Sequence, residues 1–156
     1  FRAKVAPTAV NTWLDTYELD ENDWASTAAS GNKVTNLQKF AFGLDPATSD
    51  GDITYGSGVT AGNPVADEPT PTANGTERRA VFARRKDHQS VGVTYTVQFN
   101  HGLDENDWQD SAIEPEVVES GSGDVDAVSV PYMKSINVPG AGRQKAKFFR
   151  VEISLD

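Results

Sequence analysis

The sequence predicts a mainly β protein, built as an antiparallel β-sandwich with a short α-helical N-terminal appendage. The first observation is residues 93–100, VTYTVQFN, which alternate apolar and polar side chains without interruption. The second is the closing segment, residues 147–155, where the same period of two recurs. Successive side chains of a strand point to opposite faces, so this period places one face on a core and the other in water. Five or more such segments separated by Gly-rich turns are typical of an immunoglobulin- or fibronectin-like sandwich.

Residues 1–10 are predicted to form an N-terminal strand or arm. Phe1, Ala3 and Val5 alternate with Arg2 and Lys4, which is the pattern of a short strand. Two arrangements stay open. The segment is either the first strand of its own domain or an assembly element that adds to the sheet of a neighbour, whose apolar pockets its apolar side chains would fill.

Residues 11–46 predict the helical appendage. Asn11 is placed to cap a brief helix, and the apolar face of that helix would hold Val10, Trp13, Leu14 and Tyr17. A second helix is better specified, because Thr35 and Gln38 have the spacing of a capping box. Gly43 and Pro46 then stand where a helix end is expected.

Residues 47–156 predict the sandwich, and the whole chain of 156 residues is expected to form one compact domain. The stretch 45–77 is rich in Gly, Pro, Ser, Thr and Asp, and two interpretations fit it equally: short strands at 53–55 and Val65, or a long surface excursion. Further strands are expected at 80–85, 93–100, 116–119, 127–132 and 145–155.

The composition excludes several function classes. The formal net charge is −9, which repels phosphate backbones and argues against nucleic acid as a partner. No apolar run approaches the roughly 20 residues that a membrane-spanning helix needs. The chain has no cysteine, its two histidines lie in different segments, and a Gly-x-Ser-x-Gly motif is missing, so we expect no enzymatic activity.

An acidic hexapeptide, LDENDW, occurs twice, at residues 19–24 and 103–108. One interpretation is a compact turn whose Leu and Trp pack inward. The other is a calcium site, since carboxylate and amide oxygens are the ligands that calcium takes. The candidate ligands are Asp20, Asn22, Asp23, Asp104 and Asp107, together with Asp50 and Asp52 beside the second predicted helix. The spacing does not match a complete EF-hand loop, so no cofactor is predicted and calcium is kept as the alternative.

The two tryptophans of the hexapeptides are also candidates for glycan binding. Trp24 and Trp108 are flat aromatic rings with carboxylates and amides nearby, and such a platform suits a sugar ring with one apolar face. The competing interpretation is that each ring closes one end of the sandwich. Five basic residues form a local patch that we expect to make cross-strand ion pairs, with an acidic partner surface as the alternative: Arg78, Arg79, Arg84, Arg85 and Lys86.

Residues 36–46, NLQKFAFGLDP, resemble the N-L-x-x-(Y/F)-A-x-G-x-(D/N)-P segment found near the C-termini of large secreted bacterial surface proteins. In those proteins the segment follows a thrombospondin type 3-like or dockerin-like stretch. Residues 81–86, 93–99, 103–108 and 147–151 are similar to later segments of the same proteins, in the same order. The resemblance implies a noncatalytic β-sandwich at or outside the cell surface, used for display, anchoring or assembly.

Two functions are therefore expected. The first is a non-enzymatic extracellular structural module that contacts itself or other surface proteins and assembles into a surface layer or filament by strand exchange. The alternative is a carbohydrate-binding module that uses exposed tryptophans.

Overall fold

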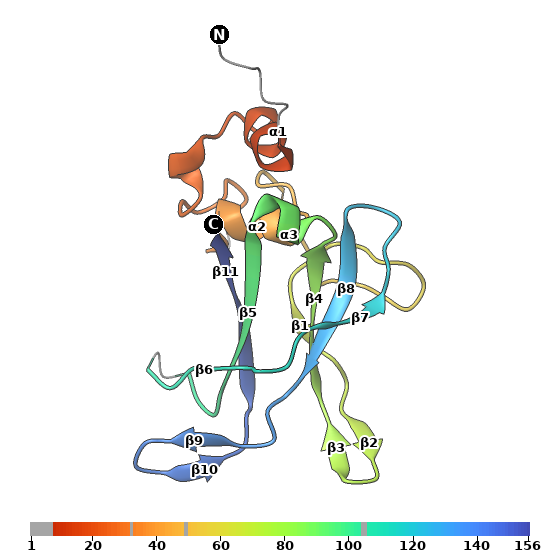
Figure 1. Ribbon diagram of the computed structural model, residues 1–156, viewed down its shortest axis with the longest axis vertical. Helices are drawn as coiled ribbons and strands as arrows, with labels where there is room; N and C mark the ends of the chain where they lie inside the picture. The colour runs from red at the N-terminus through yellow and green to blue at the C-terminus, as the bar shows by residue number, and fades with distance from the viewer. Residues whose placement is uncertain (1–7, 32, 49, 104–105) are drawn as a thin grey trace.

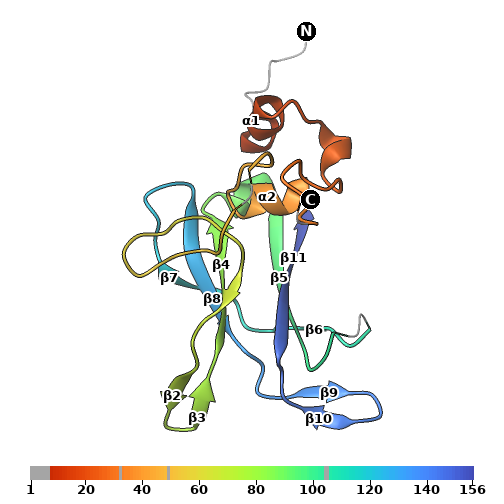
Figure 2. The ribbon, with the colours of Figure 1, turned by 180° about the vertical axis from the view of Figure 1, so that it is seen from behind.

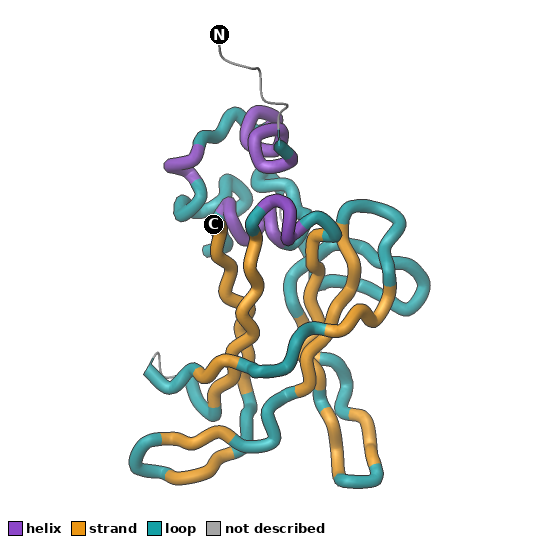
Figure 3. Tube along the Cα trace, in the orientation of Figure 1, coloured by secondary structure: helices purple, strands orange, loops and turns teal. Residues whose placement is uncertain are grey.

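A computed structural model describes residues 8–31, 33–48, 50–103 and 106–156. Most regular structure is β, arranged as two antiparallel sheets that pack against each other, with the helices gathered at one end (Figures 1 and 3). The predicted antiparallel β-sandwich with an N-terminal helical appendage is confirmed. Its assignment to the immunoglobulin or fibronectin type stays a prediction.

The first sheet has the strand order β1-β4-β8-β7. These strands are β1 (Val65–Ala66), β4 (Arg79–Arg85), β8 (Val125–Pro131) and β7 (Glu116–Glu119). The central pair, β4 and β8, runs in register from Arg79 opposite Pro131 to Arg85 opposite Val125. A register shift between Val117 and Glu119 interrupts the pairing of β7 with β8, so this edge of the sheet is bulged.

The second sheet has the order β11-β5-β6. It consists of β11 (Phe148–Leu155), β5 (Val93–Asn100) and β6 (Gln109–Asp110). The two alternating segments of the sequence are therefore neighbours, and they pair over their full length from Phe148 opposite Asn100 to Leu155 opposite Val93. Two hairpins extend the sandwich at the end away from the helices (Figure 1): β2 (Thr70–Thr72) with β3 (Gly75–Glu77), and β9 (Ile136–Val138) with β10 (Gly142–Gln144).

The core lies between the sheets and is formed by their inward faces. Phe82 of β4, Phe99 of β5 and Val128 of β8 are fully buried in one apolar cluster. Burying a side chain of this kind contributes roughly 1.5–3 kcal/mol relative to leaving it in water. The period of two in β5 and β11 has this cause: Val97, Phe99 and Val151 face the core, whereas Thr94 and Glu152 face outward and are exposed.

The helical appendage consists of α1 (Ala9–Thr16), the short 3-10 helix η1 (Glu21–Asp23) and α2 (Asn36–Ala41). The capping box predicted for the second helix is confirmed, because the Thr35 hydroxyl accepts from Gln38 N and the Gln38 side chain accepts from Thr35 N. The predicted cap of the first helix was wrong. Its N-cap is Thr8, whose hydroxyl accepts from the backbone N–H of Asn11, and the helix begins three residues earlier than Asn11 would allow.

The appendage is attached to one end of the sandwich through a second apolar cluster. Phe40, Ala41 and Val93 are its buried members, and Trp13 and Trp24 pack against it. Ile153 and Leu155 of β11 complete this cluster, so the first helices of the chain lie on the end of its last strand (Figure 2). The predicted N-terminal strand or arm of residues 1–10 lies mostly outside the described residues, which begin at Thr8, and Ala9 and Val10 already belong to α1.

The stretch 45–77 is largely turns and isolated bridges, as its Gly- and Pro-rich composition indicates. Thr54 pairs with Thr60 in one such bridge, and Val65 begins the two-residue strand β1. The structure adds a one-turn helix, α3 (His88–Val91), between β4 and β5 that the sequence pattern did not predict. No helix of the described residues combines the length and the apolar character that crossing a membrane requires.

Candidate functional site

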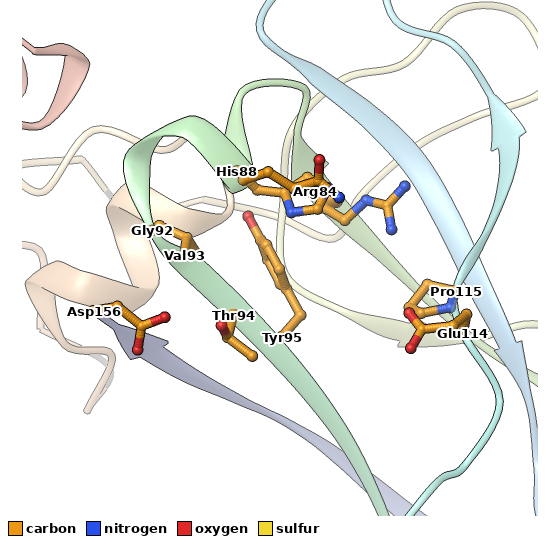
Figure 4. Close-up of a pocket in the computed structure, with 10 residues that line it drawn as sticks. Arg84, His88, Gly92, Val93, Thr94, Tyr95, Glu114, Pro115 and Asp156 are labelled. Atoms are coloured by element: carbon orange, nitrogen blue, oxygen red, sulfur yellow. The ribbon is translucent and has the colours of Figure 1, made fainter.

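Two adjoining cavities lie where the helical end meets the sandwich, and both are lined by Asp156. The first, which we call the Arg84 cavity, has a volume of about 380 Å³. Its polar lining comes from five separate parts of the chain: Arg84 of β4, His88 of α3, Thr94 of β5, Glu114 of the segment before β7 and Asp156 after β11 (Figure 4). Val93, Tyr95 and Pro115 supply apolar surface.

The strand periodicity of β4 explains why Arg84 reaches this cavity. Ala80 and Phe82 are buried in the inter-sheet core, and side chains two residues apart share a face. Arg84 is therefore the next member of the inward row, at the mouth of the space between the sheets. In Figure 4 its guanidinium extends toward Glu114 and Pro115, whereas Thr94 and Asp156 lie on the other side of Tyr95.

The opposite wall is fixed by the turn from α3 into β5. Gly92 ends α3 in the left-handed conformation, with φ of 76°, which a residue with a side chain adopts only with strain. Its carbonyl accepts from Asp156 N at 2.9 Å, and a Cβ at this position would stand 3.1 Å from the Asp156 carbonyl oxygen. The glycine thus lets the chain end of β11 lie close to the start of β5, which brings Asp156 into the cavity wall.

The electrostatics of the cavity centre on an unpaired cation. Within the described ranges, the Arg84 side chain makes no hydrogen bond or ion pair. Each of the other described arginines donates at least one hydrogen bond: Arg78, Arg79, Arg85, Arg143 and Arg150. Asp126 stands opposite Arg84 in register, but its carboxylate instead accepts from Ser120 and Gly121 N and lies 3.8 Å from Lys86.

His88 shares this environment. Its ring packs edge-on against Tyr95 with 6.0 Å between centroids. Burial lowers the pKa of His88, and the positive charge of Arg84 lowers it further, against the opposing effect of Asp87. The imidazole is therefore neutral at pH 7 and offers one donor and one acceptor. Together with the Arg84 fork and the Glu114 and Asp156 carboxylates, this set suits a small polar ligand with groups of both signs.

The second cavity, which we call the Trp24 cavity, has a volume of about 470 Å³. Trp24, Val91 and Leu155 form its apolar surface, and Glu21 and Ser90 are among its polar residues. Trp24 also stacks on Trp13, with centroids 5.6 Å apart and planes inclined by 20°. Trp24, one of the two tryptophans predicted to bind a glycan, therefore lines a cavity and also packs against the second apolar cluster.

Trp108 lies in a different place, next to β6 on the outer side of the second sheet. The Arg150 guanidinium covers its ring at 4.5 Å from the centroid, and Arg150 Nε in turn donates to the Gln98 side chain. The indole Nε1 is buried and has no hydrogen-bond partner among the residues that the structure describes. Trp24 and Trp108 do not line a common cavity, so a platform would have to use one ring at a time.

The oxygens considered for calcium already have partners within the protein at two places. Asp20 accepts from Asn22 N, and Asp23 accepts from Asp20 N, which makes residues 20–23 the capping box of η1. Asp50 accepts from the Lys39 ammonium at 2.7 Å, and the Thr48 carbonyl accepts from the same group at 2.8 Å.

The remaining calcium candidates are placed apart. Asp52 is exposed in a bridge with Asn63, Asp107 precedes β6, and Asp104 lies outside the described residues. Among the side chains that the structure describes, no group of three or more carboxylates or histidines is arranged to hold a metal ion.

The basic patch is divided by the structure. The prediction of cross-strand ion pairs is confirmed for Arg79, which lies 3.3 Å from Glu116, and for Lys86 beside Asp126. Arg84, in the middle of the same run, was not predicted as a site residue, and neither were His88, Glu114 and Asp156. The one available signal was the position of Arg84 on the inward face set by Ala80 and Phe82.

Comparisons of the chain with protein-family models, curated protein sequences and solved structures gave no match.

Proposed function

We propose that this protein is a non-enzymatic extracellular structural module that assembles with copies of itself by strand addition. The observation that carries the proposal is the open edge of β11. This strand is eight residues long, and among the described residues it pairs only with β5. An unpaired row of N–H and C=O groups is a template for another strand.

The direction of the backbone groups follows from two hydrogen bonds. Asp156 N donates to Gly92 O, so these two residues form a hydrogen-bonded pair of the β11–β5 ladder. Ser111 N donates to Val97 O at 2.8 Å, which shows that the odd residues of β5 turn away from β11. By the same alternation, the odd residues of β11 direct their N–H and C=O groups to the open edge: Phe149, Val151, Ile153 and Leu155.

The other sheet edges are poorer templates. β1 and β6 are two residues long, and β7 carries a bulge. Short or bulged edge strands are common protections against unwanted pairing. β11 has no proline and no register shift against β5, so it offers the longest regular edge of the described sandwich.

The N-terminal residues of a second copy are the proposed occupant. Phe1, Ala3 and Val5 alternate with charged residues, which suits a strand that buries one face. Such a contact is head-to-tail and does not close on itself, so it produces filaments or layers. The resemblance of residues 36–46 to segments of secreted bacterial surface proteins supports a location at or outside the cell surface.

A matched pair of substitutions at Ile153 tests the proposal. Ile153→Pro and Ile153→Ala both remove the isoleucine packing, but only proline also removes the outward N–H. We expect the wild type and Ile153→Ala to form polymers visible by light scattering and electron microscopy, and Ile153→Pro and a variant lacking residues 1–7 to remain monomeric. Melting temperatures establish that each variant is folded. A wild type that is monomeric in physiological salt would refute the proposal.

A second candidate function, carbohydrate binding, is favoured by the position of Trp24 in the wall of a 470 Å³ cavity with hydroxyl and carboxylate groups. Glycan-array screening followed by titration calorimetry tests it. Glu21 is exposed and lines this cavity, so Glu21→Ala should weaken binding without unfolding the protein. Glu18→Ala, which changes an exposed carboxylate outside the cavity, is the control. A glycan whose affinity is the same in both variants would not be bound in the Trp24 cavity.

A further inference from the structure

The Arg84 cavity has the features of a ligand site that neither proposed function uses. Arg84 belongs to the inward row of β4, yet its charged side chain makes no ion pair or hydrogen bond to any residue that the structure describes. Arg84 is partly buried, and its guanidinium, which offers five N–H donors, has no acceptor among the described residues. The Arg84 guanidinium is therefore free to donate hydrogen bonds to an acceptor group of a ligand.

The charges around Arg84 indicate which other group a ligand bound to Arg84 would carry. The cavity is lined by one guanidinium, by the neutral His88 ring, and by the carboxylates of Glu114 and Asp156. An anion that satisfied Arg84 alone would meet these two carboxylates and a protein of net charge −9. A ligand that carries a cation besides its anion matches both signs.

We propose that the Arg84 cavity binds a small zwitterion with a carboxylate and an ammonium group, of about the size of a dipeptide. The carboxylate would accept two parallel hydrogen bonds from the Arg84 fork, which is the geometry that guanidinium and carboxylate prefer. The ammonium would donate to the carboxylate of Glu114 or of Asp156. Val93, Tyr95 and Pro115 would contact the apolar middle of the ligand. This site does not depend on the assembly through β11.

The two histidines allow the site to be observed directly. Burial is the first cause of the lowered pKa of His88 and the positive charge of Arg84 is the second, so a ligand that covers the ring and places a carboxylate on Arg84 should shift the His88 signals. His101 Nδ1 lies 3.0 Å from the carbonyl of Lys145 on a different element and serves as the internal control. Both ring signals can be followed by nuclear magnetic resonance as a ligand is added.

The probes are alanyl-alanine, its N-acetyl derivative, which lacks the ammonium, and its C-terminal amide, which lacks the carboxylate. We expect alanyl-alanine to shift the His88 signals and to leave those of His101 unchanged. Each capped probe should bind at least about tenfold more weakly, since one charge-assisted contact is lost. Equal affinity for the three probes, or no change at His88 at any concentration up to saturation of the solution, would overturn the proposal.

Arg84→Gln and Arg143→Gln form the matched pair of variants. Arg143 is exposed on β10 outside the cavity, so its loss should leave the affinity unchanged. Arg84→Gln should reduce the affinity for alanyl-alanine at least about tenfold. Because Arg84 has no partner in the described chain, this variant should keep the wild-type melting temperature. Unchanged affinity in a folded Arg84→Gln protein would also overturn the proposal.

Discussion

Single residues hold the helical appendage to the sandwich, and Tyr95 is the best example. Its hydroxyl donates to the Ala41 carbonyl of the appendage at 2.5 Å and accepts from Arg85 N of β4 at 3.1 Å. Burial raises the pKa of Tyr95 to about 12, against the smaller opposing effects of its hydrogen bond from Arg85 and of nearby arginines. The neutral phenol is therefore the form that the folded protein stabilises.

This pKa predicts a stability loss at high pH. The folded-state pKa lies above the ordinary value of 10, so the contribution is complete below pH 10 and is lost as the pH rises to about 12. The full loss is about 3 kcal/mol, and roughly half of it is expected by pH 11. Tyr95→Phe should cost about 1 kcal/mol at pH 7 and should lack this component. Urea unfolding of both proteins at pH 9 and pH 11 measures it.

The other tyrosines serve as an internal reference in that comparison. The pKa values of Tyr17, Tyr55 and Tyr132 are also raised, first by burial, and these residues are present in both proteins. Their effect cancels in the difference between wild type and Tyr95→Phe. If the two proteins lose the same stability between pH 9 and pH 11, the alkaline sensitivity does not come from Tyr95.

Arg85 makes the second connection at this scale. Its guanidinium makes two hydrogen bonds to the Asp87 carboxylate, at 2.8 and 2.9 Å, and covers the Phe40 ring at 4.2 Å. Lysine keeps the charge but has neither the planar fork nor the stacking. Arg85→Lys should lower the free energy of unfolding by about 1–2 kcal/mol.

The neighbouring residue supplies the control for Arg85. Arg84→Lys changes the same side-chain type one position earlier, where no described partner is lost, so its effect should stay within about 0.5 kcal/mol. Urea denaturation at pH 7 compares both variants with the wild type. Equal destabilisation by the two substitutions would mean that the contacts of Arg85 with Asp87 and Phe40 do not stabilise the fold.

At the scale of elements, α2 is the helix that its own sequence specifies best. Thr35→Ala removes the hydroxyl that accepts from Gln38 N at 3.2 Å and should cost about 1 kcal/mol. Thr16→Ala, at the exposed end of α1, removes a hydroxyl that only donates back to Thr12 O. It should change stability by less than about 0.5 kcal/mol. Thermal unfolding followed by circular dichroism compares the two. A Thr35→Ala protein as stable as Thr16→Ala would show that the capping box is dispensable.

Some of the helices and strands could be predicted from the sequence and others could not. β5 and β11 were predicted because one face of each carries apolar side chains for the core and the other carries mostly polar ones, so their period is visible in the chain, although Gln98 and Asn100 on the polar face of β5 are buried. α3 was missed because four residues, His88–Val91, cannot display a helical period. The two strands of the β9–β10 hairpin were not predicted, since each has only three residues.

The candidate site was harder to predict for a different reason. Arg84, Glu114 and Asp156 are far apart in the chain, and only the packing of the two sheets brings them to one cavity. In the sequence, Arg84 is one of several basic residues close together. Only the structure shows that its side chain has no partner among the described residues.

At the scale of the whole molecule, the acidic turns are predicted to be stable without calcium. The carboxylates of Asp20, Asp23 and Asp50 already accept hydrogen bonds from within the protein. A bound ion would raise the melting temperature by mass action, so addition of a chelator should change it by less than about 2 °C. Scanning calorimetry with calcium and with chelator tests this. A larger fall on chelation would indicate a calcium site among the acidic residues.

The attachment of the first helices to the last strand has a consequence for synthesis of the chain. Trp13 and Trp24 pack against the same buried cluster, which includes Phe40, as Ile153 and Leu155 do, and those two residues are synthesised long after the helices. A nascent chain that ends before residue 148 therefore carries helices whose apolar faces have no complete surface to cover them. Closing this contact spans almost the whole described sequence, and such long-range closure slows folding. The appendage is thus translated well before the strand that completes its packing.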